Sequence, residues 1–361
     1  MMKYKRLLFL ILIPISFILV QVAMNNIYFA EYYSTKIYSK IAQTISFITS
    51  IFSFSLAEIL IILLVFALII YTIAVLIKTI NDKSWKYIKE LIINLGVFAS
   101  IIYFLFTLFC GLNYYRYEFT VYSQLDVRES SKEELVMLCE NLIEKANYLR
   151  TKVNVDEDGI AALDDESYYE TAKRAQYSFD NLSKIYEILR GNYPEPKPVL
   201  LSKLMSEANI TGIFVPFTFE ANVNIDIPSY TIPSTMCHEL THLRGFMRED
   251  EANFISYLAC VNSGYDDFAY SGTMLALTYG MNALYIEDYN SFEKLYYKYS
   301  EEVQKDIKYK TNYWKQFESK IADISAKVND TYLKANNQND GVRSYGRMVD
   351  LLLAEQSKNY R

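Results

Sequence analysis

Three long apolar runs constrain the fold of this chain more than any other feature. Residues 7–24, 59–77 and 91–112 contain no Asp, Glu, Lys or Arg. A helix of about 20 residues crosses the roughly 30 Å hydrocarbon core of a bilayer, and buried helices of soluble proteins rarely run so far without a charge. The sequence therefore predicts a membrane anchor with three transmembrane helices in residues 1–112, followed by one domain in residues 113–361.

The first run could also be read as a cleaved signal peptide, because Lys3, Lys5 and Arg6 precede it. Gln21 stands two residues before Ala23, where a cleavage site needs a small residue, so a retained anchor is the better prediction. The other short loops set the orientation. The loop after the second run carries four lysines and the loop after the first carries two, so the positive-inside rule places the N-terminus in the cytoplasm.

A multi-pass cell-membrane protein follows from this orientation, with the domain outside the membrane and the lipid bilayer as a partner. The chain has a net charge of −6. This mild acidity argues against nucleic acid as a partner.

The chemistry of the domain is indicated by a single motif. His238, Glu239 and His242 form H-E-x-x-H and contain the only two histidines of the chain. On a helix, side chains four residues apart lie on one face, which suits two ligands of one tetrahedral Zn²⁺ ion. Glu239 can then take a proton from a metal-bound water and pass it to a leaving amine. Such a motif also arises by chance, but Ser234 as N-cap and Gly245 as C-cap would give it a helix of its own.

The third ligand is less directly indicated. Arg248 occupies the position at which some zinc peptidases place a third histidine, and a guanidinium cannot ligate. Glu249 and Asn253 are four residues apart, so Glu249 could bind the metal while Asn253 accepts a hydrogen bond from an imidazole. Glu251 points about 200° away from Glu249 on a helix and is the alternative ligand. These acidic residues could also simply favour the helix dipole.

These residues carry a resemblance to a known family. The sequence from His238 to Phe254 resembles the bacterial membrane family catalogued as domain of unknown function 3810, as do stretches 213–224, 270–276 and 345–353. That family is similar to the gluzincin-type HExxH metallopeptidases, in which a glutamate is the third ligand, and the acidic stretch is also similar to membrane peptidases of the CAAX-processing type and to peptidases that cleave anti-repressors. The resemblance implies a zincin-like domain of the α+β class, mostly helical. It implies no substrate.

A small sheet is expected just before the motif. Apolar and polar residues alternate over residues 213–224, which predicts one strand, and Pro216 within it favours a strand at the sheet edge. An edge strand in this place could hold a peptide or protein substrate by backbone pairing, or a loop could simply cover it.

The rest of the domain reads as helices, with one further candidate residue. Helices are expected over residues 131–152, 166–190, 267–288, 291–309, 311–336 and 344–357. In gluzincins, a residue from the C-terminal side stabilises the oxyanion of the reaction intermediate, and by resemblance Tyr345 is the nominee.

The sequence thus predicts a membrane-anchored zinc metallopeptidase. The alternative is a non-catalytic sensor or scaffold with a structural zinc site, which requires a fourth protein ligand such as Cys237, Asp250 or Glu251. An intramembrane protease is disfavoured because the motif lies over 120 residues after the last apolar run. The four cysteines lack C-x-x-C spacing, so packed thiols are predicted, although a Cys237–Cys260 disulfide remains an alternative.

Overall fold

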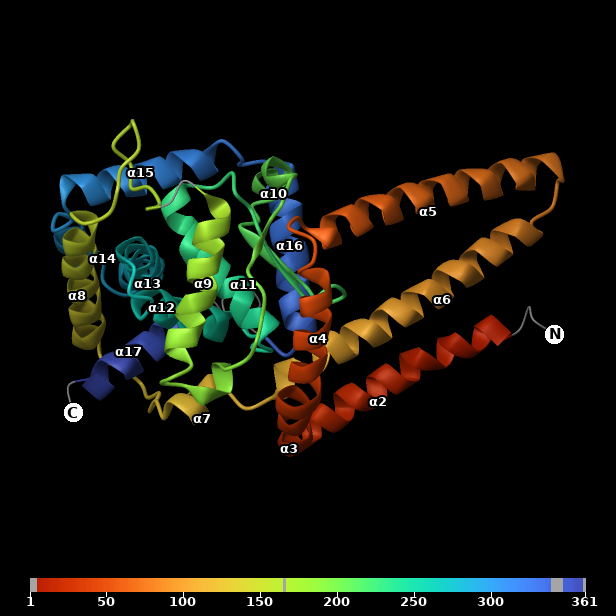
Figure 1. The fold of residues 1–361 in the computed structure, drawn as a ribbon, viewed down its shortest axis with the longest axis horizontal. Coiled ribbons are helices and arrows are strands. Elements are labelled where there is room, and N and C mark those ends of the chain that lie inside the picture. The colour runs from red at the N-terminus through yellow and green to blue at the C-terminus, as the bar shows by residue number, and fades with distance from the viewer. Residues whose placement is uncertain (1–4, 165–166, 339–346, 360–361) are drawn as a thin grey trace.

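A computed structural model describes residues 5–164, 167–338 and 347–359. The described chain is mostly helical and contains one small sheet. Three helical stretches are long and apolar enough to cross a membrane, which confirms the three predicted runs. Figure 1 shows them extending from one side of the compact remainder of the molecule. They are η1 (Arg6–Ile11) continued by α2 (Leu12–Asn25), α5 (Leu56–Asn81) and α6 (Lys86–Phe109).

Three polar side chains of these helices, Arg6, Tyr71 and Asn94, are joined by hydrogen bonds. Asn94 of α6 accepts a hydrogen bond from Arg6 at 2.7 Å and donates one to the hydroxyl of Tyr71 of α5 at 2.6 Å. These contacts link all three helices through polar side chains, and such pairing would remove the cost of an unsatisfied polar group in hydrocarbon. Elsewhere α2 packs along α6, while α5 contacts α6 near their connection.

The segment between the first two apolar helices is part of the domain wall. It forms α3 (Ile27–Tyr32), the π-helix η2 (Tyr33–Tyr38) and α4 (Ser39–Thr49). The Tyr38 hydroxyl donates to the carbonyl oxygens of His242 and Leu243, each at 3.3 Å, and Thr49 donates to the carbonyl of Thr218 at 3.0 Å. Residues before position 113 therefore help to build the surroundings of the motif.

Helices packed around α13 make the core of the domain. Helix α13 (Asp266–Glu287) runs between α8 (Lys132–Arg150) and α12 (Glu249–Val261), and buried side chains such as Phe254, Tyr270 and Leu284 fill the space between them. Helix α8 begins with a capping box formed by Ser131 and Glu134. Further helices of this part are η3 (Gly111–Tyr115), α7 (Phe119–Ser123), α9 (Tyr168–Leu182), η4 (Glu187–Leu189), α10 (Ser202–Glu207), η5 (Ser229–Thr231), α11 (Ile232–Leu243), α14 (Tyr289–Tyr296), α15 (Glu301–Lys315), α16 (Lys320–Ala335) and α17 (Met348–Asn359).

Three predicted helices have different bounds in the structure. The expected helix over residues 166–190 ends at Leu182. The expected helices over residues 291–309 and 311–336 are instead α14, α15 and α16. The side chains of Ser300 and Ser319 accept hydrogen bonds from backbone N–H groups three residues later, so each begins a new helix where a continuous one was expected.

The sheet has the strand order β1-β3-β2. Strand β1 (Lys197–Pro198) is parallel to β3 (Glu220–Val223), and β2 (Gly212–Val215) is antiparallel to β3 at the edge. The prediction of one strand over residues 213–224 was wrong, because the chain turns back between β2 and β3. Phe219 takes a left-handed conformation (φ 51°) at the end of this turn, where its buried ring packs on Tyr38 and Phe109. Pro216 lies in the turn.

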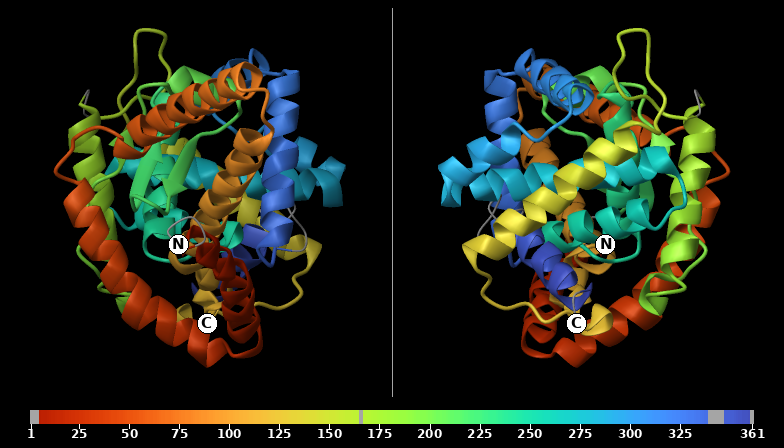
Figure 2. Two further views of the ribbon diagram at one scale, coloured as in Figure 1. Left: turned by 90° about the vertical axis from the view of Figure 1, so that its right-hand side faces the viewer. Right: turned by 90° about the vertical axis from the view of Figure 1, so that its left-hand side faces the viewer.

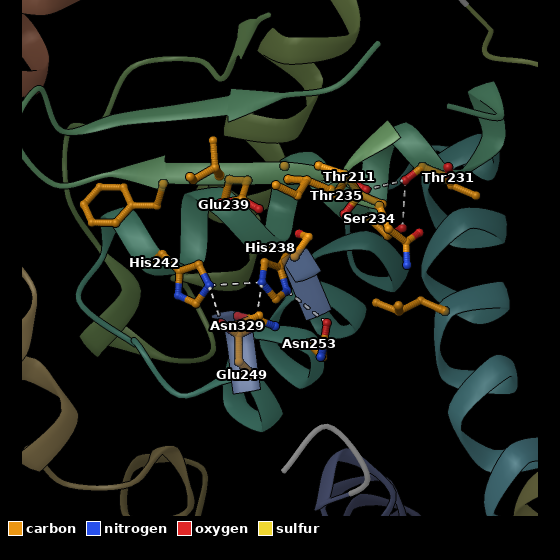
Figure 3. Close-up of a pocket in the computed structure, with 18 of the residues that line it drawn as sticks. Thr211, Thr231, Ser234, Thr235, His238, Glu239, His242, Glu249, Asn253 and Asn329 are labelled. Atoms are coloured by element: carbon orange, nitrogen blue, oxygen red, sulfur yellow. Dashed lines mark hydrogen bonds and ion pairs between the residues drawn. The ribbon is translucent and has the colours of Figure 1, made fainter. Parts of the chain in front are cut away.

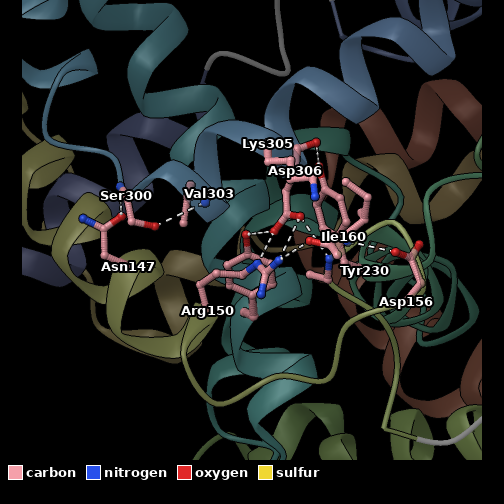
Figure 4. A network of polar contacts seen from close by, with 12 residues as sticks. Asn147, Arg150, Asp156, Ile160, Tyr230, Ser300, Val303, Lys305 and Asp306 are labelled. Carbon is pink, nitrogen blue, oxygen red and sulfur yellow. Dashed lines mark hydrogen bonds and ion pairs between the residues drawn. The ribbon is translucent and has the colours of Figure 1, made fainter.

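A buried ion pair fixes the helices behind the motif (Figure 4). The Asp306 carboxylate of α15 accepts hydrogen bonds from Arg150 of α8 and from the Tyr270 hydroxyl of α13, both at 2.6 Å, and from the Ala161 N–H at 2.9 Å. The Tyr230 hydroxyl donates to the Asp306 carbonyl at 3.1 Å. Because Tyr230 lies in η5, directly before α11, this network sets the position at which α11 begins.

Candidate metal centre

Helix α11 holds the H-E-x-x-H motif deep in the domain. It begins at Ile232, with Pro233 in its first turn. The prediction of Ser234 as the N-cap is therefore wrong, because Ser234 lies inside the helix. Proline is well tolerated there because its missing N–H would have no helical partner. Gly245 has φ 85°, and the N–H of Gly245 donates to the carbonyl of His242 at 2.8 Å. The C-cap itself is Arg244, one residue before the predicted cap, and Gly245 directly after it lets the chain turn back towards α12.

The turn brings Glu249, the first residue of α12, against both histidines (Figure 3). The Nε2 atoms of His238 and His242 are 3.0 Å apart. The Glu249 carboxylate places Oε2 at 3.2 Å from the first ring nitrogen and Oε1 at 3.6 Å from the second. Ligand atoms about 2.1 Å from one ion in a tetrahedral site lie about 3.4 Å apart. The three side chains therefore form a group that could hold a metal ion.

The other ring nitrogens are turned towards acceptors. His238 Nδ1 lies 2.9 Å from Asn253 Oδ1, and His242 Nδ1 lies 2.8 Å from the carbonyl oxygen of Phe246. An acceptor at each Nδ1 favours the proton there, which leaves the Nε2 lone pairs free to ligate. Asn253 is itself held in place, since its amide nitrogen donates to the Tyr279 hydroxyl at 3.2 Å.

The remaining acidic candidates point elsewhere. Glu251 Oε1 accepts a hydrogen bond from the N–H of Phe119 at 2.6 Å, and Asp250 Oδ2 accepts one from Arg347 at 3.0 Å.

Cys237 and Cys260 are buried free thiols, so the alternative of a disulfide between them is not realised. Within residues 5–164, 167–338 and 347–359, the metal-ligating group comprises His238, His242 and Glu249 with no fourth member. Tyr345 lies outside the described residues.

Glu239 lies beside this group in a poorly solvated position. Its side chain is buried, and Oε2 has no hydrogen-bond partner among the described residues. Burial raises the pKa of the Glu239 carboxyl to about 8, although the backbone N–H of Phe214 and the nearby His238 lower it in part. A carboxylate with a pKa in this range can accept and release a proton near neutral pH.

The two imidazoles differ in their electrostatics. Burial alone would lower the pKa of His238, but the Glu249 carboxylate outweighs it and raises this pKa to about 9. Burial lowers the pKa of His242 to about 4. The His242 ring is thus held neutral, as a metal ligand must be. The His238 ring is held in its protonated form by the Glu249 carboxylate, and a bound cation would take the place of that proton.

Gly212 is a further site residue, which the sequence reading did not identify. A Cβ atom at this position would lie 2.6 Å from Glu239 Oε1 and 2.9 Å from Thr235 Cγ2. Only glycine lets the edge strand β2 approach the motif helix so closely. The signal was present in the sequence, since a single glycine opens the alternating stretch before the motif and such glycines mark close approach. No comparable sequence signal indicated that the Phe246 carbonyl would pair with the His242 ring, or that Tyr38 would contact the motif helix.

The group opens into a cavity of about 1420 Å³. Its polar end is lined by His238, Glu239, His242 and Glu249 together with β2, and its walls further out are mostly apolar and come from α5, α6, α13 and α16. The site is therefore reached from a large, partly open cavity.

Most of the chain matches a known protein family. Residues 33–353 match a family described as a protein of unknown function (DUF3810). This range contains the whole candidate metal centre together with α5 and α6. No curated protein and no solved structure matches the chain.

Proposed function

We propose that this chain, which belongs to the DUF3810 family, is a zinc metallopeptidase anchored in a membrane by its three apolar N-terminal helices. One observation carries the proposal. Two imidazoles and one carboxylate converge at 3.0 to 3.6 Å, and a second carboxylate, Glu239, lies beside them without a partner for Oε2. A purely structural zinc site is normally closed by a fourth protein ligand, and the described residues offer none there.

His238, His242 and Glu249 would hold the ion. Zinc in such a three-ligand site lowers the pKa of a water molecule towards about 7 and polarises a carbonyl group. Glu239 supplies the proton transfer. Its Oε2 takes a proton from water as the water oxygen bonds to the peptide carbonyl carbon, and then gives a proton to the nitrogen as the C–N bond breaks. The products are a carboxyl group and an amino group, which ionise in water to a carboxylate and an ammonium group.

The edge strand β2 would hold the substrate backbone. Strand β2 pairs with β3 on one side, lines the same cavity as the ligand group, and approaches Glu239 closely at Gly212. An extended peptide added along its outer edge would pair with backbone groups of residues 212–215. Its carbonyl groups would then pass in front of α11.

Basic residues precede α2, and four lysines gather where α5 and α6 are joined, namely Lys78, Lys83, Lys86 and Lys89. This excess supports a placement of the N-terminus in the cytoplasm and of the domain on the outer side of the cell membrane. The expected substrates are therefore peptides or proteins exposed on that side.

The Glu239→Gln variant tests the proposal. The purified full-length chain, its Glu239→Gln variant and a matched Glu144→Gln variant at an exposed position of α8 are loaded with zinc and incubated with proteins extracted from membranes of cells that lack the chain. New peptide amino termini are then counted by mass spectrometry. We expect the wild type and Glu144→Gln to generate the same termini and Glu239→Gln to generate none, with equal zinc content in all three. Equal cleavage by Glu239→Gln would refute the assigned role.

A further inference from the structure

The cavity that contains the ligand group continues between two of the apolar helices. Residues Ala57, Leu60, Ile61 and Leu64 line it from α5, and they share one face because they are spaced three and four residues apart. The opposite wall consists of residues at every fourth position of α6, namely Phe98, Ile102 and Phe106. The space in front of the candidate metal centre is therefore continuous with the gap between α5 and α6.

Both helices reach the centre at the same end. The first N–H groups of α5, those of Leu56 and Ala57, donate to the Glu220 carboxylate of β3 at 3.2 and 2.7 Å. Leu64 is eight residues further along, which is about 12 Å along the helix. On the other side, Cys110, directly after α6, has its thiol 3.7 Å from the sulfur of Met247, which lines the same cavity. The motif is therefore close in space to the domain ends of α5 and α6, although more than 120 residues separate it from the last apolar run.

The gap is not filled by the described chain. Figure 1 shows α5 and α6 close together at their connection and spread apart towards the domain, and the left view of Figure 2 shows the same divergence. Leu60, Ile61 and Leu64 are 47%, 52% and 39% exposed although they line a cavity. None of the residues in the apolar window of α5 is buried. A surface of this kind within a bilayer lies against lipid or against an apolar segment of another molecule.

We propose that the substrates are polypeptides anchored in the same bilayer by a transmembrane helix, which enters between α5 and α6; this inference rests on the proposed peptidase function. A chain inside hydrocarbon must be helical to satisfy its own backbone, whereas a chain that pairs with β2 must be extended. One cavity can hold both conformations, one after the other along the substrate chain. Its apolar part accepts the helix, and its polar part presents β2, Glu239 and the ligand group to the first extended residues outside the membrane.

This occupant explains the cavity better than the others do. A lipid chain would cover the apolar walls but would make no use of the edge strand at the inner end. A second copy of the chain would cover α5 without placing any extended segment in front of α11. A soluble peptide would use β2 and would leave the walls of α5 and α6 without a role.

The test compares two probes that share their cleavable part. One is a pool of synthetic polypeptides with a leucine–alanine helix of about 20 residues, long enough to cross a bilayer, followed by a randomised extension. The other is the same extension without the helix. Both are supplied at equal concentration to proteoliposomes that contain the zinc-loaded full chain, and new amino termini are measured over time. We expect the anchored pool to be cut at least about tenfold faster, because anchoring raises its effective concentration at the site.

Confinement to the membrane would by itself favour the anchored pool, so variants of the gap decide the question. Leu64→Trp narrows the gap, and Ile102→Trp repeats the test from the opposite wall. Leu63→Trp is the matched control, since Leu63 is 59% exposed and points about 100° away from Leu64. The measured quantity is the ratio of anchored to free cleavage. We expect this ratio to fall at least about fivefold in Leu64→Trp and Ile102→Trp and to stay unchanged in Leu63→Trp.

The outcomes separate this inference from the proposed function. Equal cleavage of both pools, or equal ratios in all three variants, would overturn the inference while the peptidase function stands. A photo-crosslinker at position 64 that reacts only with lipid or only with a second copy would also overturn it. Cleavage of neither pool, with the wild type indistinguishable from Glu239→Gln, would remove the peptidase function and this inference together.

Discussion

Replacement of Asn253 by alanine should weaken zinc binding without touching any ligand. In the structure, Asn253 Oδ1 lies 2.9 Å from Nδ1 of His238, and its amide nitrogen donates to the Tyr279 hydroxyl at 3.2 Å. The amide therefore fixes both the proton position and the orientation of the ring whose Nε2 faces His242 and Glu249. Alanine removes that acceptor and leaves the Nδ1–H buried without a partner.

The magnitude follows from the kind of bond that is lost. A hydrogen bond to a group that carries charge contributes about 1.5 to 3 kcal/mol, and an imidazole that binds a cation is such a group. At 1.4 kcal/mol for each factor of ten, this corresponds to a roughly 10- to 100-fold weaker zinc affinity, the range typical of residues that orient a ligand histidine. Asn253→Asp keeps the acceptor and should retain most of the affinity.

Competition with a fluorescent zinc chelator on the purified chain measures this effect. Asn262→Ala is the matched control, because Asn262 lies at the C-terminal end of the same helix and donates to the carbonyl of Leu258 at 2.8 Å, away from the centre. We expect wild-type affinity for this control. An unchanged zinc affinity of Asn253→Ala would show that the imidazole needs no such partner, and our account of how the ring is held would be refuted.

Three further predictions test other parts of the structure. Gly212→Ala places a Cβ 2.6 Å from Glu239 Oε1. Peptide cleavage should therefore fall about 100-fold, while the zinc content measured by elemental analysis stays the same. Full activity would show that β2 can move away from Glu239. Asp306→Ala leaves the Arg150 charge buried without its partner, so the free energy of unfolding should fall by about 3 to 5 kcal/mol. The double variant Asp306→Leu with Arg150→Met leaves no unpaired charge, so thermal unfolding should show a smaller loss of stability. Burial raises the pKa of Glu355 to about 7, above the value of about 4.3 in unfolded chains, so the ionised form destabilises the fold increasingly as the pH rises between these values. Glu355→Gln in α17 should therefore increase the free energy of unfolding by roughly 3 to 4 kcal/mol at pH 8 and leave it nearly unchanged at pH 4. Equal gains at both pH values would contradict this.

The apolar helices and the motif were predictable because each depends on local sequence. A charge-free run of sufficient length has few folds open to it, and two histidines four residues apart need only a helix to lie on one face. Glu249 required one more step, a turn that reverses the chain, and Gly245 signalled it.

The features that failed depend on contacts distant in sequence. The stretch 213–224 alternates throughout, and the turn within it carries neither glycine nor asparagine at the left-handed position. Phe219 adopts that conformation because its ring packs on Tyr38 and Phe109, which are far away along the chain. Likewise, nothing in the loop between the first two apolar runs indicated that Tyr38 would reach the motif helix.

Zinc content tests the central claim most directly. The full-length chain and its His242→Ala variant are purified with zinc present, passed over a chelating resin, and analysed for metal by elemental analysis, with X-ray absorption at the zinc edge to identify the ligands. We predict a stoichiometric zinc ion with imidazole ligands in the wild type and its loss in His242→Ala. Equal zinc in both proteins, or none in the wild type, would contradict the assignment of His238, His242 and Glu249 as a metal centre.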